Sequence, residues 1–278
     1  MISASPSISL VTCSYQQARF LDATMRSVFD QAYPDLQYVI VDGGSCDGSA
    51  QIIANHAESL AYWVSEPDAG QTDALIKGFN QVTGEVCGWL CSDDLLLPGA
   101  LAIVSEYFRV HPEVDALYGD SIWIDAEGQP IRAKKEMDFD RFVFLHDHNY
   151  IPQPSMFWRR RLYETVGGLN PNFNLAMDSD LWDRFAHRTR IVHLPRYLSC
   201  MRFYPEQKTR SLKPSGQAED LLIRTRSSPL ARLPWLRPVL HGTARLKRFM
   251  GKALAGGYSA PVPDDLLPWL EAHATPGL

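Results

Sequence analysis

Residues 36–44 read LQYVIVDGG, an apolar run that two glycines end. Its apolar side chains occupy consecutive positions rather than alternating ones. The strand that this run predicts would therefore be buried on both faces, as in a parallel sheet. The flanking residues 18–31 and 49–57 predict helices. A buried strand between two helices is typical of an α/β fold.

The same alternation runs through the first 125 residues. Further strands are predicted at 8–12, 61–67 and 85–94, and further helices at 72–82 and 98–110. This order predicts a doubly wound, mostly parallel sheet with flanking helices and right-handed crossovers. Residues 126–210 are less regular, with a helix predicted at 174–190 and a pair of strands at 191–204.

Residues 211–278 form a helical extension of different character. Between Leu221 and Pro263 there are eight basic residues and no acidic one. Apolar residues recur there at spacings of three and four, which predicts an amphipathic helix with a basic opposite face. Residues 224–254 could then contact an anionic membrane surface. Alternatively, the helix packs on the main domain and its basic face is solvated.

The composition is that of a globular protein and excludes several classes. The chain has 278 residues, 45% of them hydrophobic and 21% charged, and a net charge of −5. This balance does not suggest a nucleic-acid partner. We find no signal peptide at the start and no run of the roughly 18 apolar residues that a membrane span needs. Five scattered cysteines fit thiols in a reducing compartment, so we expect a cytoplasmic protein.

Polar residues gather where the predicted strands end, at 12–15, Asp42, 66–68 and 92–94. The carboxyl ends of parallel strands form the binding crevice of doubly wound sheets. Asp93 and Asp94 are adjacent there, and one carboxylate could hold a divalent cation while the other accepts hydrogen bonds from hydroxyl groups. The alternative is helix capping, but three leucines separate Asp94 from the next predicted helix.

Four ordered segments carry a resemblance to a known family. They are VTCSYQQARFLDATMRSVFDQAYPDLQYVIVDGGSCDGS, SEPDAGQTDALIKGFNQVTGEVCGWLCSDD, IPQPSMFWRR and AMDSDLWDRF. In this order they resemble an inverting family 2 glycosyltransferase with the GT-A fold, over roughly residues 7 to 210. The resemblance implies a domain at 1–210, with a nucleotide-sugar half at about 1–125 and an acceptor half at about 126–210.

The resemblance also implies roles for residues of the nucleotide-sugar half. Thr12 and Tyr15 follow the first strand, where the family contacts the base and ribose. Asp42 matches the aspartate that hydrogen-bonds the base, although Asp-Gly-Gly is also turn chemistry. Asp68 would border the nucleotide and the donor sugar. Lys77 could approach the diphosphate, or could simply be solvated.

The catalytic groups are implied in the same way. Ser92 to Asp94 match a DxD-type motif with serine in its first position, so that Asp93 would reach the ribose and Asp94 would bind Mg²⁺ or Mn²⁺. Asp178 takes the position of the family's catalytic base, and Asp180 is the second candidate. A carboxylate is required because an acceptor hydroxyl does not ionise near neutral pH. Helix capping is the alternative role for Asp178.

The acceptor half contributes fewer implied contacts. Gln153 lies where the family shapes the acceptor side, and Trp182 could stack on a sugar, although core packing is the commoner role of such a tryptophan. Tyr204 stands where many relatives have a histidine. Tyr204, Lys208 or Arg210 could therefore contact the diphosphate.

The implied reaction moves a sugar from a UDP, GDP or dTDP donor to a glycan or lipid-linked acceptor. A binding scaffold that has lost its chemistry is one alternative. A sugar-phosphate nucleotidyltransferase is another, although no glycine-rich loop follows the first strand.

Overall fold

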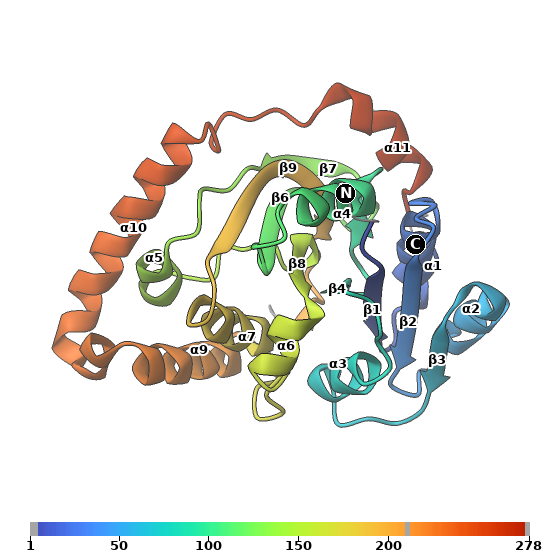
Figure 1. The fold of residues 1–278 in the computed structure, drawn as a ribbon, viewed down its shortest axis with the longest axis horizontal. Helices are drawn as coiled ribbons and strands as arrows, with labels where there is room; N and C mark the ends of the chain where they lie inside the picture. The colour runs from blue at the N-terminus through green and yellow to red at the C-terminus, as the bar shows by residue number, and fades with distance from the viewer. Residues whose placement is uncertain (1–4, 209–211, 276–278) are drawn as a thin grey trace.

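Figure 1 shows the computed structural model, which describes residues 5–208 and 212–275. The strands are β1 Ile8–Ser14, β2 Leu36–Asp42, β3 Tyr62–Ser65, β4 Val86–Trp89, β5 Leu95–Leu96, β6 Ala116–Ile124, β7 Pro130–Lys134, β8 Met156–Arg159 and β9 Ile191–Arg202. The α-helices are α1 Ala18–Phe29, α2 Ser49–Asn55, α3 Gln71–Phe79, α4 Ala100–Val110, α5 Arg141–His146, α6 Arg160–Thr165, α7 Met177–Ala186, α9 Lys213–Ser227, α10 Arg237–Leu254 and α11 Leu267–Ala272. Short 3-10 helices are η1 Ala57–Ser59, η2 Gln153–Ser155, η3 Pro229–Arg232, η4 Pro234–Leu236 and η5 Asp264–Leu266.

The described residues form one nine-stranded sheet in the order β3-β2-β1-β4-β8-β6-β9-β5, with β7 paired to β6. Strands β3, β2, β1 and β4 pair in parallel. Strand β8 is antiparallel to both β4 and β6, so it joins the two halves of the sheet. The predicted α/β fold with flanking helices and a helical C-terminal part is confirmed.

The central strand β1 shows why the sheet is buried on both faces. All seven of its residues are buried. Ile8 and Leu10 pack with side chains of α1, α2 and α4, whereas Val11 and Cys13 pack with side chains of α3 and α7. Alternate side chains of a strand point to opposite faces. Consecutive apolar residues are therefore required when helices cover both faces.

The predicted strand pair at 191–204 is wrong, because residues 191–202 form the single strand β9. It runs parallel to β6, and the register moves from Gly119↔Leu194 to Asp120↔Tyr197. Pro195 and Arg196 are left out of the pairing at this irregularity. Proline has no N–H to donate, so a break in the ladder is where a strand tolerates it.

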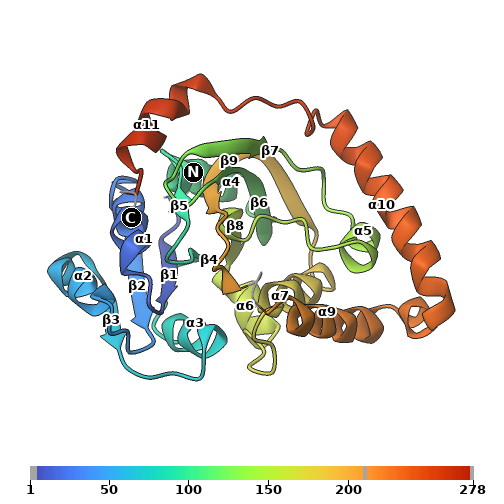
Figure 2. The ribbon, with the colours of Figure 1, turned by 180° about the vertical axis from the view of Figure 1, so that it is seen from behind.

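The C-terminal residues wrap around the domain. Figures 1 and 2 show α9 and α10 along one side of the molecule, and α11 beside α1 on another side. His273 Nε2, just after α11, lies 3.1 Å from Asp30 Oδ2 at the end of α1. Within residues 5–208 and 212–275, the structure contains no helix with the length and apolar character needed to cross a membrane.

Candidate active site

The turn between β4 and β5 carries Asp93 and Asp94 beside the end of β9. Asp94 Oδ1 accepts a hydrogen bond of 2.8 Å from the backbone N–H of Arg202. The Arg202 side chain donates through Nε to the carbonyl oxygen of Asp93, also at 2.8 Å. Thr24 Oγ1 lies 2.9 Å from the carbonyl oxygens of Ser92 and Asp94. The turn is therefore fixed by α1 on one side and by β9 on the other.

Tyr204 fixes the side chain of Asp93. Its hydroxyl donates to Asp93 Oδ2 at 2.8 Å and lies 3.3 Å from Gln17 Nε2. The Tyr204 ring packs on Phe20, with 5.0 Å between ring centroids. Tyr204 thus orients one of the two adjacent carboxylates, a role that the sequence did not indicate.

The electrostatics of this turn favour a cation. Burial raises the pKa of Asp93, and burial together with the Asp93 charge raises the pKa of Asp94 well above its usual range. The Cys91 Sγ atom, one carboxylate oxygen of Asp93 and one of Asp94 lie within 4.8 Å of one another. The hydrogen bond that Cys91 donates to Cys13, together with burial, raises the Cys91 pKa, so its thiol stays protonated. Two carboxylates without a thiolate suit a hard cation such as Mg²⁺ or Mn²⁺.

The base and ribose contacts were expected at the ends of β1 and β2. Tyr15 is 62% exposed, and a Cβ atom added to Gly43 would lie 3.2 Å from its ring and 2.8 Å from Asp68 Oδ2. Tyr15 and Asp68 therefore meet over Gly43. Asp42 is fully buried and binds Ser45 and Ser65 through both of its oxygens. Its turn-building role is thus present, and its base contact stays a prediction.

Two side chains predicted to contact the nucleotide are engaged elsewhere. Thr12 is fully buried, and its hydroxyl lies 3.0 Å from the Tyr38 hydroxyl in the core. Its side chain is therefore not presented to a ligand, and this contact is withdrawn. Lys77 forms ion pairs with Glu66 at 2.9 Å and Asp73 at 3.5 Å, at the exposed surface of α3.

Asp178 lies in a cleft between the start of α7, the first turns of α9 and strands β7 and β9. Lining residues include Lys134, Gln153, Met201, Lys213, Gln217 and Asp220. Asp178 Oδ2 accepts a 2.9 Å hydrogen bond from Asn149 Nδ2, and Oδ1 accepts one of 2.7 Å from the Ser179 N–H. Burial, with a smaller contribution from the Asp220 charge, raises the pKa of Asp178 to about 6. Such a carboxylate is ionised at neutral pH and is a stronger base than an exposed aspartate.

Glu219 of α9, rather than Asp178, satisfies the backbone N–H groups before α7. Its carboxylate accepts hydrogen bonds from the N–H groups of Asn174, Leu175 and Ala176 at 2.8–3.2 Å. The sequence did not indicate this role, because Glu219 lies more than 40 residues away and no local pattern links the two segments. Asp178 accepts only the Ser179 N–H of the first turn of α7, so the start of α7 depends on both carboxylates and the capping alternative is present in part.

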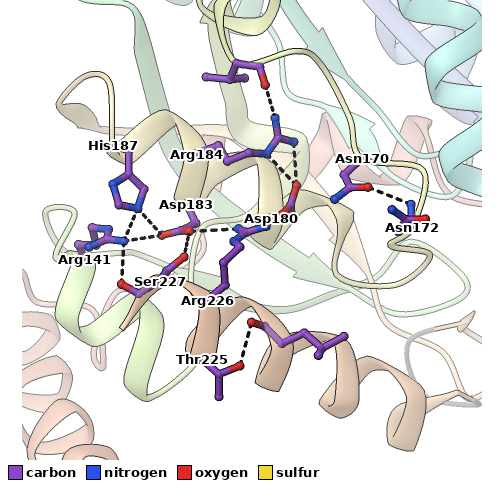
Figure 3. A network of polar contacts seen from close by, with 12 residues as sticks. Arg141, Asn170, Asn172, Asp180, Asp183, Arg184, His187, Thr225, Arg226 and Ser227 are labelled. Carbon is purple, nitrogen blue, oxygen red and sulfur yellow. Dashed lines mark hydrogen bonds and ion pairs between the residues drawn. The ribbon is translucent and has the colours of Figure 1, made fainter. Parts of the chain in front are cut away.

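Asp180, the second candidate base, lies in an ion-pair network. Figure 3 shows its carboxylate between Arg184 of α7 and Arg226 of α9. It is fully buried, and its oxygens lie 2.8 Å from Arg184 and 2.5 Å from Arg226. Asp183 joins the network through Arg141 and Arg226. These contacts give Asp180 the role of fastening α9 to α7, and the assignment as a base is withdrawn.

Gln153 and Lys208 lie between the Asp93–Asp94 turn and the Asp178 cleft. Gln153 Nε2 donates to the carbonyl oxygen of Trp89 at 2.8 Å, and its Oε1 accepts from the Cys91 thiol at 3.3 Å. Lys208 Nζ donates to the carbonyl oxygen of Asn174 at 2.8 Å, just before α7. Arg210 lies outside the described residues.

Trp182 belongs to the core, so its expected place on the acceptor side is wrong. It is fully buried and stacks on Trp89, with 5.3 Å between ring centroids and 18° between ring planes. Trp158 and Phe185 also pack against Trp182. A ring enclosed in this way cannot stack on a sugar.

We expect Trp182→Ala to lower the free energy of unfolding by about 3–5 kcal/mol, because it leaves a large cavity in the core. Trp235→Ala is the matched control, since that ring is 72% exposed. Its effect should stay within about 0.5 kcal/mol. Urea unfolding monitored by circular dichroism measures both values. Equal effects of the two substitutions would contradict the core assignment.

The fold defines the class of protein. Staphylococcus aureus TarS 1–349 in complex with UDP is similar to it, with a TM-score of 0.64 at 17% identity, over 95% of this chain and 77% of that chain. The mannosyltransferase PcManGT of Pyrobaculum calidifontis, in complex with GDP-Man and Mn²⁺, has a TM-score of 0.61 at 20% identity, over 97% and 80% of the two chains. This chain spans 39% of the longer TarS structure. The architecture is that of the GT-A glycosyltransferases.

The sequence comparisons then give the family. The profile described as Glycosyl transferase family 2 matches residues 9–167, so the chain belongs to this family and is a glycosyltransferase. An uncharacterized glycosyltransferase of Mycobacterium tuberculosis is 27% identical over 202 residues, 72% of this chain and 75% of the relative. A PGL/p-HBAD biosynthesis glycosyltransferase of Mycobacterium bovis is 30% identical over 184 residues, 65% and 68% of the two chains.

Proposed function

We propose that the protein transfers a sugar from a nucleoside-diphosphate donor to an acceptor hydroxyl with inversion of configuration. Its acceptor would be a glycan or a lipid-linked glycan, and its place of action the cytoplasmic side of the cell. The observation that carries this proposal is the cleft around Asp178, a carboxylate with a raised pKa, next to the turn of Asp93 and Asp94. Gln153 joins the two places, because it lines the cleft and also binds Trp89 and Cys91 of the β4 segment.

Each half of the site supplies a different part of the reaction. Asp178 would take the proton of the acceptor hydroxyl while the hydroxyl oxygen attacks the anomeric carbon of the donor. Asp93 would hold the ribose hydroxyls and Asp94 a divalent cation. When bound, the cation neutralises negative charge on the departing nucleoside diphosphate. Tyr204 donates to Asp93 of this turn, and the Lys208 charge acts on Cys91 just before it, so both residues are proposed to contact the diphosphate.

The donor is proposed to be a UDP or GDP sugar, because structures of similar fold contain UDP, UDP-GlcNAc and GDP-Man, and a dTDP sugar stays a candidate from the family resemblance alone. A thermal-shift screen of these donors, with and without Mn²⁺, tests this proposal. A ligand that binds only the native state, present at a concentration 100 times its dissociation constant, stabilises the protein by about 2.7 kcal/mol. At least one donor should raise the melting temperature, and more strongly with Mn²⁺. A screen in which no donor raises it would contradict the proposed donor class.

The transfer rate should depend on pH through Asp178. Because its folded-state pKa is about 6, the base form predominates at pH 7 and is lost as the pH falls below 6. We expect kcat to decrease about tenfold per pH unit on this acid limb. Asp220→Asn should move the limb to lower pH, since the Asp220 charge helps to raise the Asp178 pKa. A limb that does not move in Asp220→Asn would contradict this coupling.

A further inference from the structure

Exposed apolar side chains gather on the outer part of the C-terminal helices. Eleven of the sixteen large hydrophobic residues that are exposed in the described chain lie between Leu221 and Tyr258. They include Leu222, Trp235, Val239, Phe249, Met250 and Leu254. Figure 1 shows α10, which carries several of them, at the outer edge of the molecule. An apolar concentration of this kind marks an interaction surface.

The orientation of α10 explains this exposure. The helix contacts the domain through basic residues: Lys247 pairs with Asp140, Arg248 pairs with Asp147 at 2.5 Å, and Lys252 pairs with Glu136 at 3.1 Å. The buried apolar side chains of α10 are those of Leu240 and Ala244. A surface helix usually does the reverse and turns its apolar face to the core.

The opposite face of α10 is apolar and in contact with solvent. Val239, Leu246 and Met250 are spaced by seven and four residues, which places them on one side of a helix. They are 61%, 60% and 56% exposed. Phe249 and Leu254 flank this row and are 56% and 89% exposed. We call the exposed apolar residues of α10 and Trp235 of η4 the outer face.

We infer that the outer face docks on an anionic membrane surface. Exposed Arg245 of α10 borders it, Arg232 of η3 is also exposed three residues before Trp235, and residues 221–263 contain no carboxylate. A surface that combines apolar side chains with basic ones fits an interface of acyl chains and anionic headgroups. The exposed ring of Trp235 suits the boundary between these two layers.

Charge disfavours a second copy of the chain as the partner. Pairing two outer faces around a two-fold axis would place Arg245 of both copies in one interface, and the segment has no carboxylate to offset this charge. Like charges that face each other across an interface oppose association. Docking on a membrane is independent of the proposed reaction, because the outer face contains none of the residues proposed for transfer.

Co-sedimentation with vesicles tests the inference. Wild-type protein should sediment with vesicles of phosphatidylcholine and phosphatidylglycerol, and much less with phosphatidylcholine alone. The double variant Phe249→Glu with Met250→Glu should lose at least tenfold in apparent affinity for the anionic vesicles. Arg245→Gln should lose about fivefold, the contribution of one basic side chain near an anionic surface.

Val110→Glu is the matched control, because Val110 is 52% exposed at the end of α4 and outside the outer face. It should bind anionic vesicles as the wild type does. Unchanged melting temperatures would show that all variants are folded. Absence of wild-type binding, or equal binding by the double variant, would overturn the inference. The inference would also be overturned if the wild type formed a dimer in sedimentation equilibrium and did not bind vesicles, while the double variant was monomeric.

Discussion

Asp178→Asn is expected to lower kcat by about 10²–10⁴-fold, the usual contribution of a positioned general base. The amide can keep the contact with the Ser179 N–H, but it cannot accept the proton of the acceptor hydroxyl. The donor KM should hardly change, because the residue lies in the cleft proposed for the acceptor rather than in the Asp93–Asp94 turn. Initial rates at saturating donor and acceptor measure this effect.

Asp220→Asn is the control for the first prediction, because Asp220 lines the same cleft and also has a pKa raised by burial. It removes a carboxylate from the cleft without removing the proposed base. At pH 7 and above its kcat should stay near that of the wild type. A large loss in Asp220→Asn together with a small one in Asp178→Asn would mean that the base is misassigned.

Asp94→Asn is expected to lower kcat/KM by about 10²–10³-fold, the scale on which removal of one group that stabilises transition-state charge acts. The amide oxygen can still accept the Arg202 N–H, so the turn should keep its shape. The dependence of the rate on Mn²⁺ concentration should flatten, because a carboxylate ligand of the cation has been lost. A titration with Mn²⁺ under initial-rate conditions measures both effects.

Asp93→Asn distinguishes the proposed role of Asp93 from that of Asp94. Tyr204 can still donate to the amide oxygen, and the proposed role of Asp93 is to bind ribose hydroxyls. This variant should therefore raise the donor KM and keep a steep response to Mn²⁺. An unchanged Mn²⁺ response in Asp94→Asn, with a flattened one in Asp93→Asn, would reverse the proposed roles.

Much of the fold could be predicted because local patterns of apolar residues determine its helices and strands. The buried run at 36–44 and the helices beside it determine the parallel half of the sheet. Polar residues at strand ends then indicated where the Asp93–Asp94 turn would lie. The second half was harder, because β9 crosses an irregularity at Pro195 that reads in the sequence as the end of one strand and the start of another.

The missed features depend on contacts between distant segments. Asp178 and Asp180 are two residues apart on one helix, yet only the packing of α9 places Arg226 on Asp180. Glu219 reaches the start of α7 for the same reason. For α10 the sequence predicted an amphipathic helix but could not tell which face would pack, and its contacts with Asp140, Asp147 and Glu136 decided this.

The proposed inverting transfer can be followed directly by ¹H NMR. A panel of UDP, GDP and dTDP sugars is incubated with Mn²⁺, the wild-type protein and a mixture of glycan acceptors, and the anomeric proton of the transferred sugar is observed. We expect release of the nucleoside diphosphate and a product with the anomeric configuration opposite to that of the donor, both formed about 10²–10⁴-fold more slowly by Asp178→Asn. A product with retained configuration, or equal turnover by Asp178→Asn, would contradict the proposed transfer.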